Sequence, residues 1–101
     1  MTAQNLIAIL HQHRAELSAM GVKSLMPFGS IVHGQERPDS AIDILVVFSR
    51  PVGLLAFIRL KQRLAELLGR PVDLVTPEAL KPPLREGILR EAQNAGQGLE
   101  I

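Results

Sequence analysis

The chain of 101 residues contains no cysteine, tryptophan or tyrosine, and its only aromatic residues are Phe28, Phe48 and Phe57. Without cysteine, a protein cannot form disulfides, thiolate zinc sites or a nucleophilic thiol. Proteins that bind single-stranded nucleic acid usually stack the bases on exposed aromatic rings. All three phenylalanines lie in apolar patterns that predict core positions. Direct nucleic-acid binding is therefore not expected.

The chain also lacks an excess of either charge and any long apolar run. Eleven Lys and Arg residues against ten Asp and Glu residues give a net charge of +1, so no general attraction to nucleic acid is expected. No run approaches the roughly 20 apolar residues of a membrane helix, and the first residues lack the basic and apolar regions of a signal peptide. We expect one globular domain over residues 1–101, in the cytoplasm and without a membrane partner.

Apolar residues recur at helical spacing in three segments and form strand-like runs in three shorter ones. The patterns predict helices over residues 4–19, 54–68 and 84–94. They predict strands over residues 22–28, 41–48 and 71–75. A brief helix over residues 31–33 is expected after a capping Ser30, and a helical turn is expected to begin at Thr76-Pro77-Glu78. The tail from residue 96 onward is not assigned.

The order of these elements predicts an α/β (α+β) fold with a small sheet. The strand over residues 41–48 is mostly apolar on both faces, which is typical of a central strand covered by helices on at least one side. Two helices supply the core residues expected to cover it: Leu54, Leu55, Ile58, Leu64, Leu67 and Leu68 from the first, and Leu84, Ile88 and Leu89 from the second. The most basic stretch, with Arg59, Lys61, Arg63 and Arg70, is expected to be a solvated surface.

Two of the predicted strands each carry a single acidic residue, Asp43 and Asp73, within an apolar run. A buried carboxylate costs several kcal/mol unless it is paired or bound to a metal. Asp43 therefore either serves a function or faces solvent at the margin of the sheet. If the two strands are neighbours, the two carboxylates converge on one face of the sheet.

The turn at Gly29-Ser30 precedes the acidic strand. A glycine turn that leads into a helix presents backbone N–H groups and a hydroxyl to an anion such as phosphate. Converging carboxylates nearby would bind Mg²⁺, which prefers oxygen ligands and shares them with substrate phosphates. Such a combination is typical of phosphoryl and nucleotidyl transfer. On spacing alone the signal is weak, because Gly-Ser turns are common and acids on strands are often edge residues or salt-bridge partners.

A longer pattern raises the specificity of this signal. It consists of Gly29-Ser30-x-x-x-Gly34 followed by Arg37-Pro38-Asp39-Ser40-x-Ile42-Asp43-Ile44-Leu45-Val46. This pattern resembles the signature of the minimal nucleotidyltransferases of the DNA polymerase beta superfamily, which is usually Gly-Ser-x-Ala-Arg-Gly and then Ser-Asp-Ile-Asp-Leu. The resemblance continues through the leucine-rich helix to residues 69–81, which resemble the family's third acidic strand and the turn after it.

The resemblance implies a palm-like mixed sheet flanked by helices and a transfer of AMP from ATP to an acceptor. It implies that Gly29 and Ser30 bind the triphosphate and that Asp43 and Asp73 bind Mg²⁺. Family members of this length typically act as antitoxins paired with a HEPN-type RNase toxin. Some of them inactivate the toxin by transferring AMP to one of its tyrosines.

The chain departs from the family pattern at two positions. Ala41 stands where the family has the first metal-binding acid, and a methyl group cannot bind a metal. Asp39 lies on the same strand face if the strand extends that far, but about 6.6 Å further along, at a position that is not a ligand in the family. His33 stands where the family usually has Arg; it is either a weaker, pH-dependent phosphate contact or a surface residue.

Two hypotheses follow for the function. In the first, the chain is an antitoxin-type nucleotidyltransferase with residual AMP transfer, which the retention of Gly29, Ser30, Asp43 and Asp73 favours. In the second, the chain is catalytically silent and neutralises its partner by binding alone, which Ala41 favours, because loss of one acid weakens at least one ion of a two-metal site. The preferred nucleotide and any homo-oligomer are left open.

Overall fold

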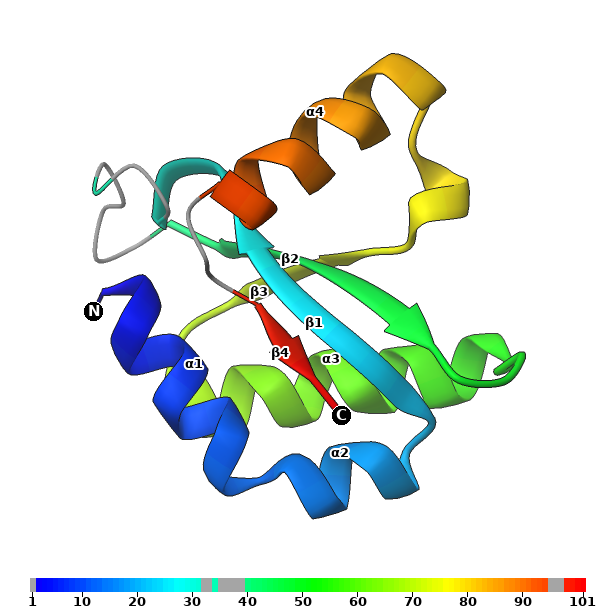
Figure 1. Cartoon of the computed structure of the whole chain (residues 1–101). Helices are drawn as coiled ribbons and strands as arrows, with labels where there is room; N and C mark the ends of the chain where they lie inside the picture. Colours follow the sequence, from blue (N-terminus) through cyan, green and yellow to red (C-terminus); the bar gives the residue numbers. More distant parts are fainter. Residues whose placement is uncertain (1, 32–33, 35–39, 95–97) are drawn as a thin grey trace.

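The computed structural model describes residues 2–31, 34, 40–94 and 98–101 and shows a twisted sheet with helices on both faces (Figure 1). The elements in chain order are α1 (Ala3–Gln12), α2 (Arg14–Ala19), β1 (Val22–Phe28), the 3₁₀ turn η1 (Gly29–Ile31), β2 (Ile42–Phe48), α3 (Leu54–Leu68), β3 (Val72–Val75), the 3₁₀ turn η2 (Pro77–Ala79), α4 (Pro82–Asn94) and β4 (Leu99–Glu100). No helix among the described residues is long and apolar enough to cross a membrane.

The sheet has four strands in the order β3-β2-β1-β4. β1 is antiparallel to both β2 and β4, whereas β2 is parallel to β3, so the sheet is mixed as the resemblance implied. β2 is an interior strand, which explains why it is the most continuously apolar segment of the chain. In the register of the sheet, Asp43 lies between Phe28 of β1 and Asp73 of β3.

The two faces of the sheet differ in their covering. Alternate residues of β2, Ile42, Ile44 and Val46, belong to one buried cluster with leucines of α1 and α3. These two helices lie on one side of the sheet, and α4 lies on the other side across β1 (Figure 1). Side chains alternate along a strand, so Asp43 projects from the face opposite to this core, on the side of α4.

The predicted helix over residues 4–19 was wrong in its continuity, because the chain forms two helices separated at His13. The N–H of His13 donates to the carbonyl of Leu10, three residues back, and its backbone leaves the helical region with φ −109° and ψ 17°. The buried leucines of the two helices are Leu6, Leu10 and Leu17. The turn between Leu10 and Leu17 has only polar residues at the core-facing positions, so no apolar burial keeps the helix straight.

The bounds of α3 confirm the predicted helix, but its buried face was predicted wrongly in the first two turns. Leu54, Leu55 and Ile58 are 74%, 63% and 40% exposed. The buried leucines of this helix are Leu60, Leu64 and Leu68, and Leu60 was missed. The helix starts beyond the end of β2 (Figure 1), so its first turns extend past the sheet that would cover them.

The C-terminal third contains further corrections. α4 begins at Pro82 rather than at residue 84, and Leu84 is 57% exposed, while Ile88 is buried as predicted. The side chain of Leu89 lies outside the described part. β4 was not predicted, because a strand of two residues has no periodic pattern; it pairs with β1 through Ser24↔Glu100 and Leu25↔Leu99.

The turns follow the predictions in part. η2 confirms the helical turn after Thr76, although the Thr76 side chain makes no capping hydrogen bond. Ser30 lies inside η1 rather than before a helix, which corrects its predicted capping position. Residues 32–33 of the predicted brief helix lie outside the described residues.

Candidate active site

Asp43 and Asp73 are paired directly across the two parallel strands. Each is the second residue of its strand, and the register places Asp43 opposite Asp73, with Ile42 opposite Val72 before them. Neighbouring strands lie about 4.8 Å apart, and residues that are paired in this way project to the same face. The prediction that the two acids lie side by side on one face of the sheet is therefore confirmed.

The two carboxylates differ in their surroundings. Asp43 is half-buried, while Asp73, on the edge strand, is exposed. Burial, and secondly the charge of Asp73, raise the pKa of Asp43 above its usual range. Both causes disfavour the ionised form of Asp43. A cation bound between the two acids would favour the ionised form of Asp43 and would cancel its repulsion by Asp73. The pair is therefore suited to bind a cation.

Replacement of Asp73 by asparagine is expected to lower the pKa of Asp43 while leaving it above its usual range, because the repulsion is removed and the burial remains. Titration of the Asp43 side-chain carboxyl carbon by NMR measures this change. The control is Glu78→Gln, which makes the same change in net charge on an exposed residue of η2. An equal shift in both variants would show that Asp73 has no specific effect on Asp43.

The raised pKa of Asp43 also determines how this group affects stability. Because the folded chain holds the Asp43 proton at a higher pH than the unfolded chain does, the contribution of this group to stability falls as the pH rises through the interval between the two pKa values. Asp43→Asn is therefore expected to raise Tm at pH 7, and the difference from the native chain should shrink in acid. Thermal unfolding followed by circular dichroism at a series of pH values measures it.

Gly29 lies against the carboxylate of Asp43. Its φ is +75°, and a Cβ at this position would lie 2.7 Å from Oδ2 of Asp43. A side chain at position 29 is thus opposed twice, by a backbone conformation that L-residues rarely adopt and by the approach of the acid. The sequence predicted Gly29 as a phosphate contact; its role in making room for Asp43 needs the pairing of Phe28 with Asp43 and was not foreseen.

The remaining predicted site residues are described to different extents. Ser30 lies in η1 next to Gly29, and its side chain lies outside the described part. His33 and Asp39 lie outside the described residues, so their predicted positions stay predictions. Ala41 immediately precedes β2 and is half-buried.

Arg70 is a residue near the acids that the sequence reasoning assigned wrongly to a solvated surface. It is half-buried, and its Nη2 donates to the carbonyl of Ser40 at 2.8 Å and to the Ser40 hydroxyl at 3.2 Å.

Arg63 is also half-buried, and it donates to both carboxylate oxygens of Glu16 at 2.5 and 3.1 Å. A spacing pattern shows which residues are basic, but not which of them find acceptors elsewhere in the chain.

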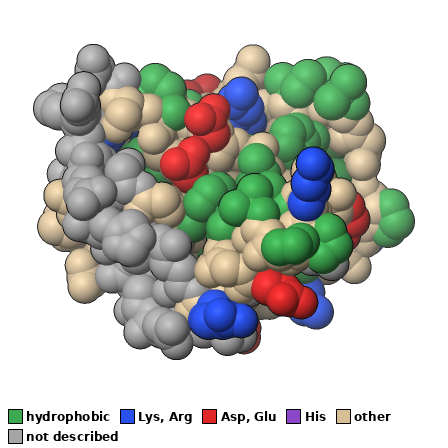
Figure 2. Space-filling view, turned by 90° about the horizontal axis from the view of Figure 1, so that it is seen from above, with side chains coloured by type: hydrophobic (Ala, Val, Ile, Leu, Met, Phe, Trp, Pro, Cys, Tyr) green, Lys and Arg blue, Asp and Glu red, His purple; other side chains and the backbone are tan. Residues whose placement is uncertain are grey.

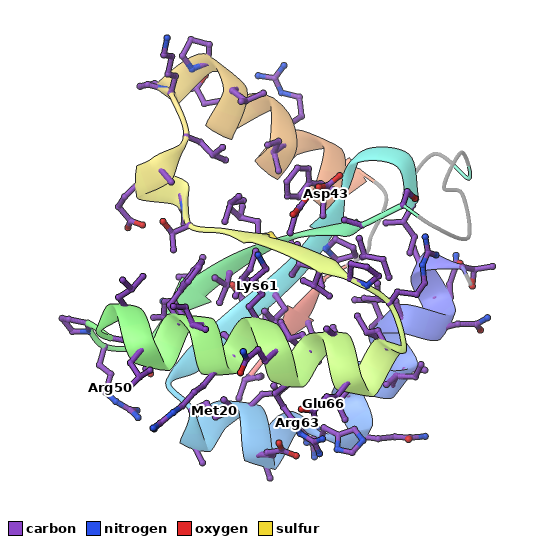
Figure 3. The ribbon with its side chains drawn as sticks, turned by 180° about the vertical axis from the view of Figure 1, so that it is seen from behind. Met20, Asp43, Arg50, Lys61, Arg63 and Glu66 are labelled. Carbon is purple, nitrogen blue, oxygen red and sulfur yellow. The ribbon has the colours of Figure 1, made fainter. Side chains whose placement is uncertain are left out.

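The donor set of the site fits one hard divalent cation. Mg²⁺ in such sites takes one or two carboxylates and fills its remaining positions with water and substrate phosphate oxygens. Two carboxylates, Asp43 and Asp73, are paired across the two strands. Figure 2, a view from above, shows acidic side chains next to hydrophobic ones on the upper face of the molecule. Figure 3 shows Asp43 on the α4 side of the sheet. Across the described ranges, no three His, Asp or Glu side chains gather as a metal site.

A cleft of about 650 Å³ lies at the opposite end of β2, lined mainly by apolar side chains that include Val47, Phe48, Leu54 and Phe57. Neither acid lines it. The cleft contains one exposed acid, Glu78, and no paired carboxylates among its lining residues. The paired carboxylates lie instead near the N-terminal ends of β2 and β3.

Comparison with known proteins identifies the family and agrees with the observed fold. Residues 10–94 match the family model described as a nucleotidyltransferase domain. The chain is 41% identical over 92 residues to the protein adenylyltransferase MntA of Thermococcus cleftensis, with 90% of this chain and 93% of the relative covered. A solved structure provisionally described as a minimal nucleotidyltransferase shares 39% identity at a TM-score of 0.77, with 91% of this chain and 94% of that one covered.

A more distant likeness concerns the fold alone. It is to a chain from the complex of a tri-AMPylated Shewanella oneidensis HEPN toxin with an MNT antitoxin, at 21% identity and a TM-score of 0.51, with 89% of this chain and 69% of that one covered. The family model covers the glycine turn and both acidic strands, and the archaeal relative is similar along nearly its whole length. The chain therefore belongs to the nucleotidyltransferase-domain family, among its minimal nucleotidyltransferases.

Proposed function

We propose that this chain is the antitoxin of a HEPN-type toxin and that it transfers AMP from Mg-ATP to that partner, at a rate reduced by Ala41. The observation that carries the proposal is the pairing of Asp43 with Asp73, with Gly29 against the Asp43 carboxylate. The similar protein of Thermococcus cleftensis is named a protein adenylyltransferase, and the Shewanella complex contains an AMPylated HEPN toxin. The partners would meet in the cytoplasm.

Each group of the site has a defined part in such a transfer. A hydroxyl oxygen of the acceptor protein bonds to the α-phosphorus of ATP, the bond to the pyrophosphate oxygen breaks, and the hydroxyl proton goes to solvent. The backbone at Gly29 and Ser30 would bind the triphosphate. Asp43 and Asp73 would hold Mg²⁺, which when bound neutralises charge on the phosphates. His33, if it faces the phosphates, would add a pH-dependent positive charge.

Ala41 limits what this set of residues can do. Two carboxylates suffice for one ion, but the family's third acid helps to hold two ions at a short separation. We therefore expect ATP binding to be less affected than the transfer step. The same departure supports the second candidate function, a chain that neutralises its partner by binding alone.

The test is a transfer assay with the co-encoded partner, Mg²⁺ and ATP labelled at the α-phosphate. The chain has no tyrosine, so any label on a tyrosine belongs to the partner. We expect slow labelling by the native chain, loss of at least about 90% of it in Asp43→Asn and Asp73→Asn, and little change in Glu78→Gln. These losses assume that each carboxylate is a direct metal ligand, since even outer partners of a metal site are worth 10–100-fold. Labelling that survives both Asp substitutions would refute the assigned site.

An unlabelled partner, in a complex that still forms, would instead support neutralisation by binding. Complex formation is measured separately, by co-purification and by inhibition of the toxin's RNase activity. The two candidate functions are thus separated by one pair of measurements on the same complex.

A further inference from the structure

A single guanidinium joins the beginnings of the two strands that carry the acids. Nη2 of Arg70 donates to the carbonyl of Ser40 at 2.8 Å and to its hydroxyl at 3.2 Å, although the two residues are 30 positions apart. Ser40 lies two residues before β2, and Arg70 lies two residues before β3. The bonds therefore connect the two chain segments immediately before the paired strands.

The next residue along extends this connection. The carbonyl of Pro71 accepts a hydrogen bond from the N–H of Ile42 at 2.9 Å. The regular pairing of β2 with β3 then begins with Ile42↔Val72 and continues with Asp43↔Asp73. Arg70 and Pro71, consecutive residues before β3, thus bond to Ser40 and Ile42, the two neighbours of Ala41.

The position of the acids makes this connection relevant to the site. Asp43 and Asp73 form only the second pair of the ladder, and the ends of strands are where local opening costs least. Opening of the first two pairs at this end, Ile42↔Val72 and Asp43↔Asp73, would separate the two carboxylates. Ala41, where the family has its first acid, lies between Ser40 and Ile42. The hydrogen bonds of these two neighbours to Arg70 and Pro71 therefore also fix the position of Ala41.

The chemistry at Ser40 suits arginine better than lysine. The guanidinium is planar, carries its donors in a rigid arrangement and keeps its charge when partly buried. Here one nitrogen contacts two oxygens of the same residue. A lysine ammonium is a flexible point donor, and it would lose more conformational freedom to make the same contacts.

We propose that Arg70 is a positioning residue of this site, which sets the spacing of Asp43 and Asp73 by fixing residues 40–42 at the start of β2. Its effect on metal binding rests on the proposed function, whereas its effect on the strand ends does not. Arg70 touches neither substrate nor metal in this assignment; it acts through the backbone of Ser40.

The first test measures backbone amide hydrogen exchange in the native chain, Arg70→Met, Arg70→Lys and the control Arg63→Met. The control removes the hydrogen bonds from Arg63 to Glu16, which join α3 to α2. We expect the Ile42 amide to exchange about tenfold faster in R70M relative to the middle of β2, since a hydrogen bond from a charged donor is worth at least this much. R70K should recover part of the protection, and R63M should leave the ratio unchanged.

The second test measures Mn²⁺ affinity by electron paramagnetic resonance in chains that also carry Ala41→Asp. Adding R70M is expected to weaken Mn²⁺ binding by about tenfold, the scale of residues that orient metal ligands, and adding R63M is expected to leave it unchanged. An unchanged exchange ratio in R70M would overturn the proposal, as would faster exchange with unchanged Mn²⁺ affinity. If A41D bound no Mn²⁺, the proposed function would fail, and the exchange ratio would still decide whether Arg70 fixes the strand ends.

Discussion

Ala41→Asp is expected to raise AMP transfer to the partner by at least about 100-fold. The new carboxylate would lie two residues before Asp43, immediately before β2, and it would complete an acid set that now consists of Asp43 and Asp73. Residues that only orient a metal ligand are worth 10–100-fold in affinity or activity, so a direct ligand should reach or exceed the upper end of that range. The measurement is initial rate of label transfer under saturating Mg²⁺ and ATP.

The matched control for this gain is Ala41→Asn, which adds nearly the same volume without a carboxylate. It should transfer AMP no faster than the native chain. Equal rates for the native chain and A41D would show that Ala41 does not mark a missing ligand. They would favour an arrangement in which two carboxylates are enough.

The added acid has a second effect that does not depend on catalysis. A third carboxylate close to Asp43 increases the repulsion that Asp73 already exerts on it, so A41D should have a lower Tm than the native chain in the absence of divalent ions. A ligand that binds only the folded state raises stability by mass action. Mg²⁺ should therefore raise the Tm of A41D more than that of the native chain, and thermal unfolding with and without Mg²⁺ measures the difference.

Gly29→Ala is expected to abolish both the Mn²⁺ binding and the AMP transfer that A41D is expected to gain. The new methyl group would lie 2.7 Å from Oδ2 of Asp43, so the short acidic side chain has to turn away from its position beside Asp73. In the A41D background, the loss of transfer should be at least about 100-fold, on the same reasoning as for a lost ligand. Label transfer and Mn²⁺ affinity are the two measurements.

Gly69→Ala is a close control, because Gly69 also has a positive φ, +67°, and a Cβ there would meet nothing within 4 Å. Both substitutions carry the backbone cost of the left-handed conformation, about 1–2 kcal/mol, which corresponds to a fall in Tm of roughly 4–16 °C for a domain of this size. Only G29A should also lose Mn²⁺. If G69A weakened Mn²⁺ binding equally, the loss would reflect general destabilisation and not the contact with Asp43.

Local patterns in the sequence were enough to find most of the elements. β1 and the bounds of α3 agree with the prediction, and β2 and β3 each begin one residue later than predicted. The spacing of apolar residues and the presence of turn residues involve only a few neighbouring positions. They therefore predict helices, strands and turns without knowledge of the fold. For the same reason, the prediction was wrong about Leu54, Leu55 and Ile58. An apolar stripe shows that a helix has a hydrophobic face, but not how far the sheet beneath it extends.

By itself, the sequence determined the family, the mixed sheet with flanking helices, the two lone acids and the alanine at position 41. These features depend only on residue types and on short spacings between them. Only the tertiary structure decided that Asp73 lies directly opposite Asp43, that Gly29 makes room for the Asp43 carboxylate, and that Arg70 bonds to Ser40. Each of these contacts joins segments far apart in the chain, and their meeting depends on the register of β2 between β1 and β3, which no local pattern encodes.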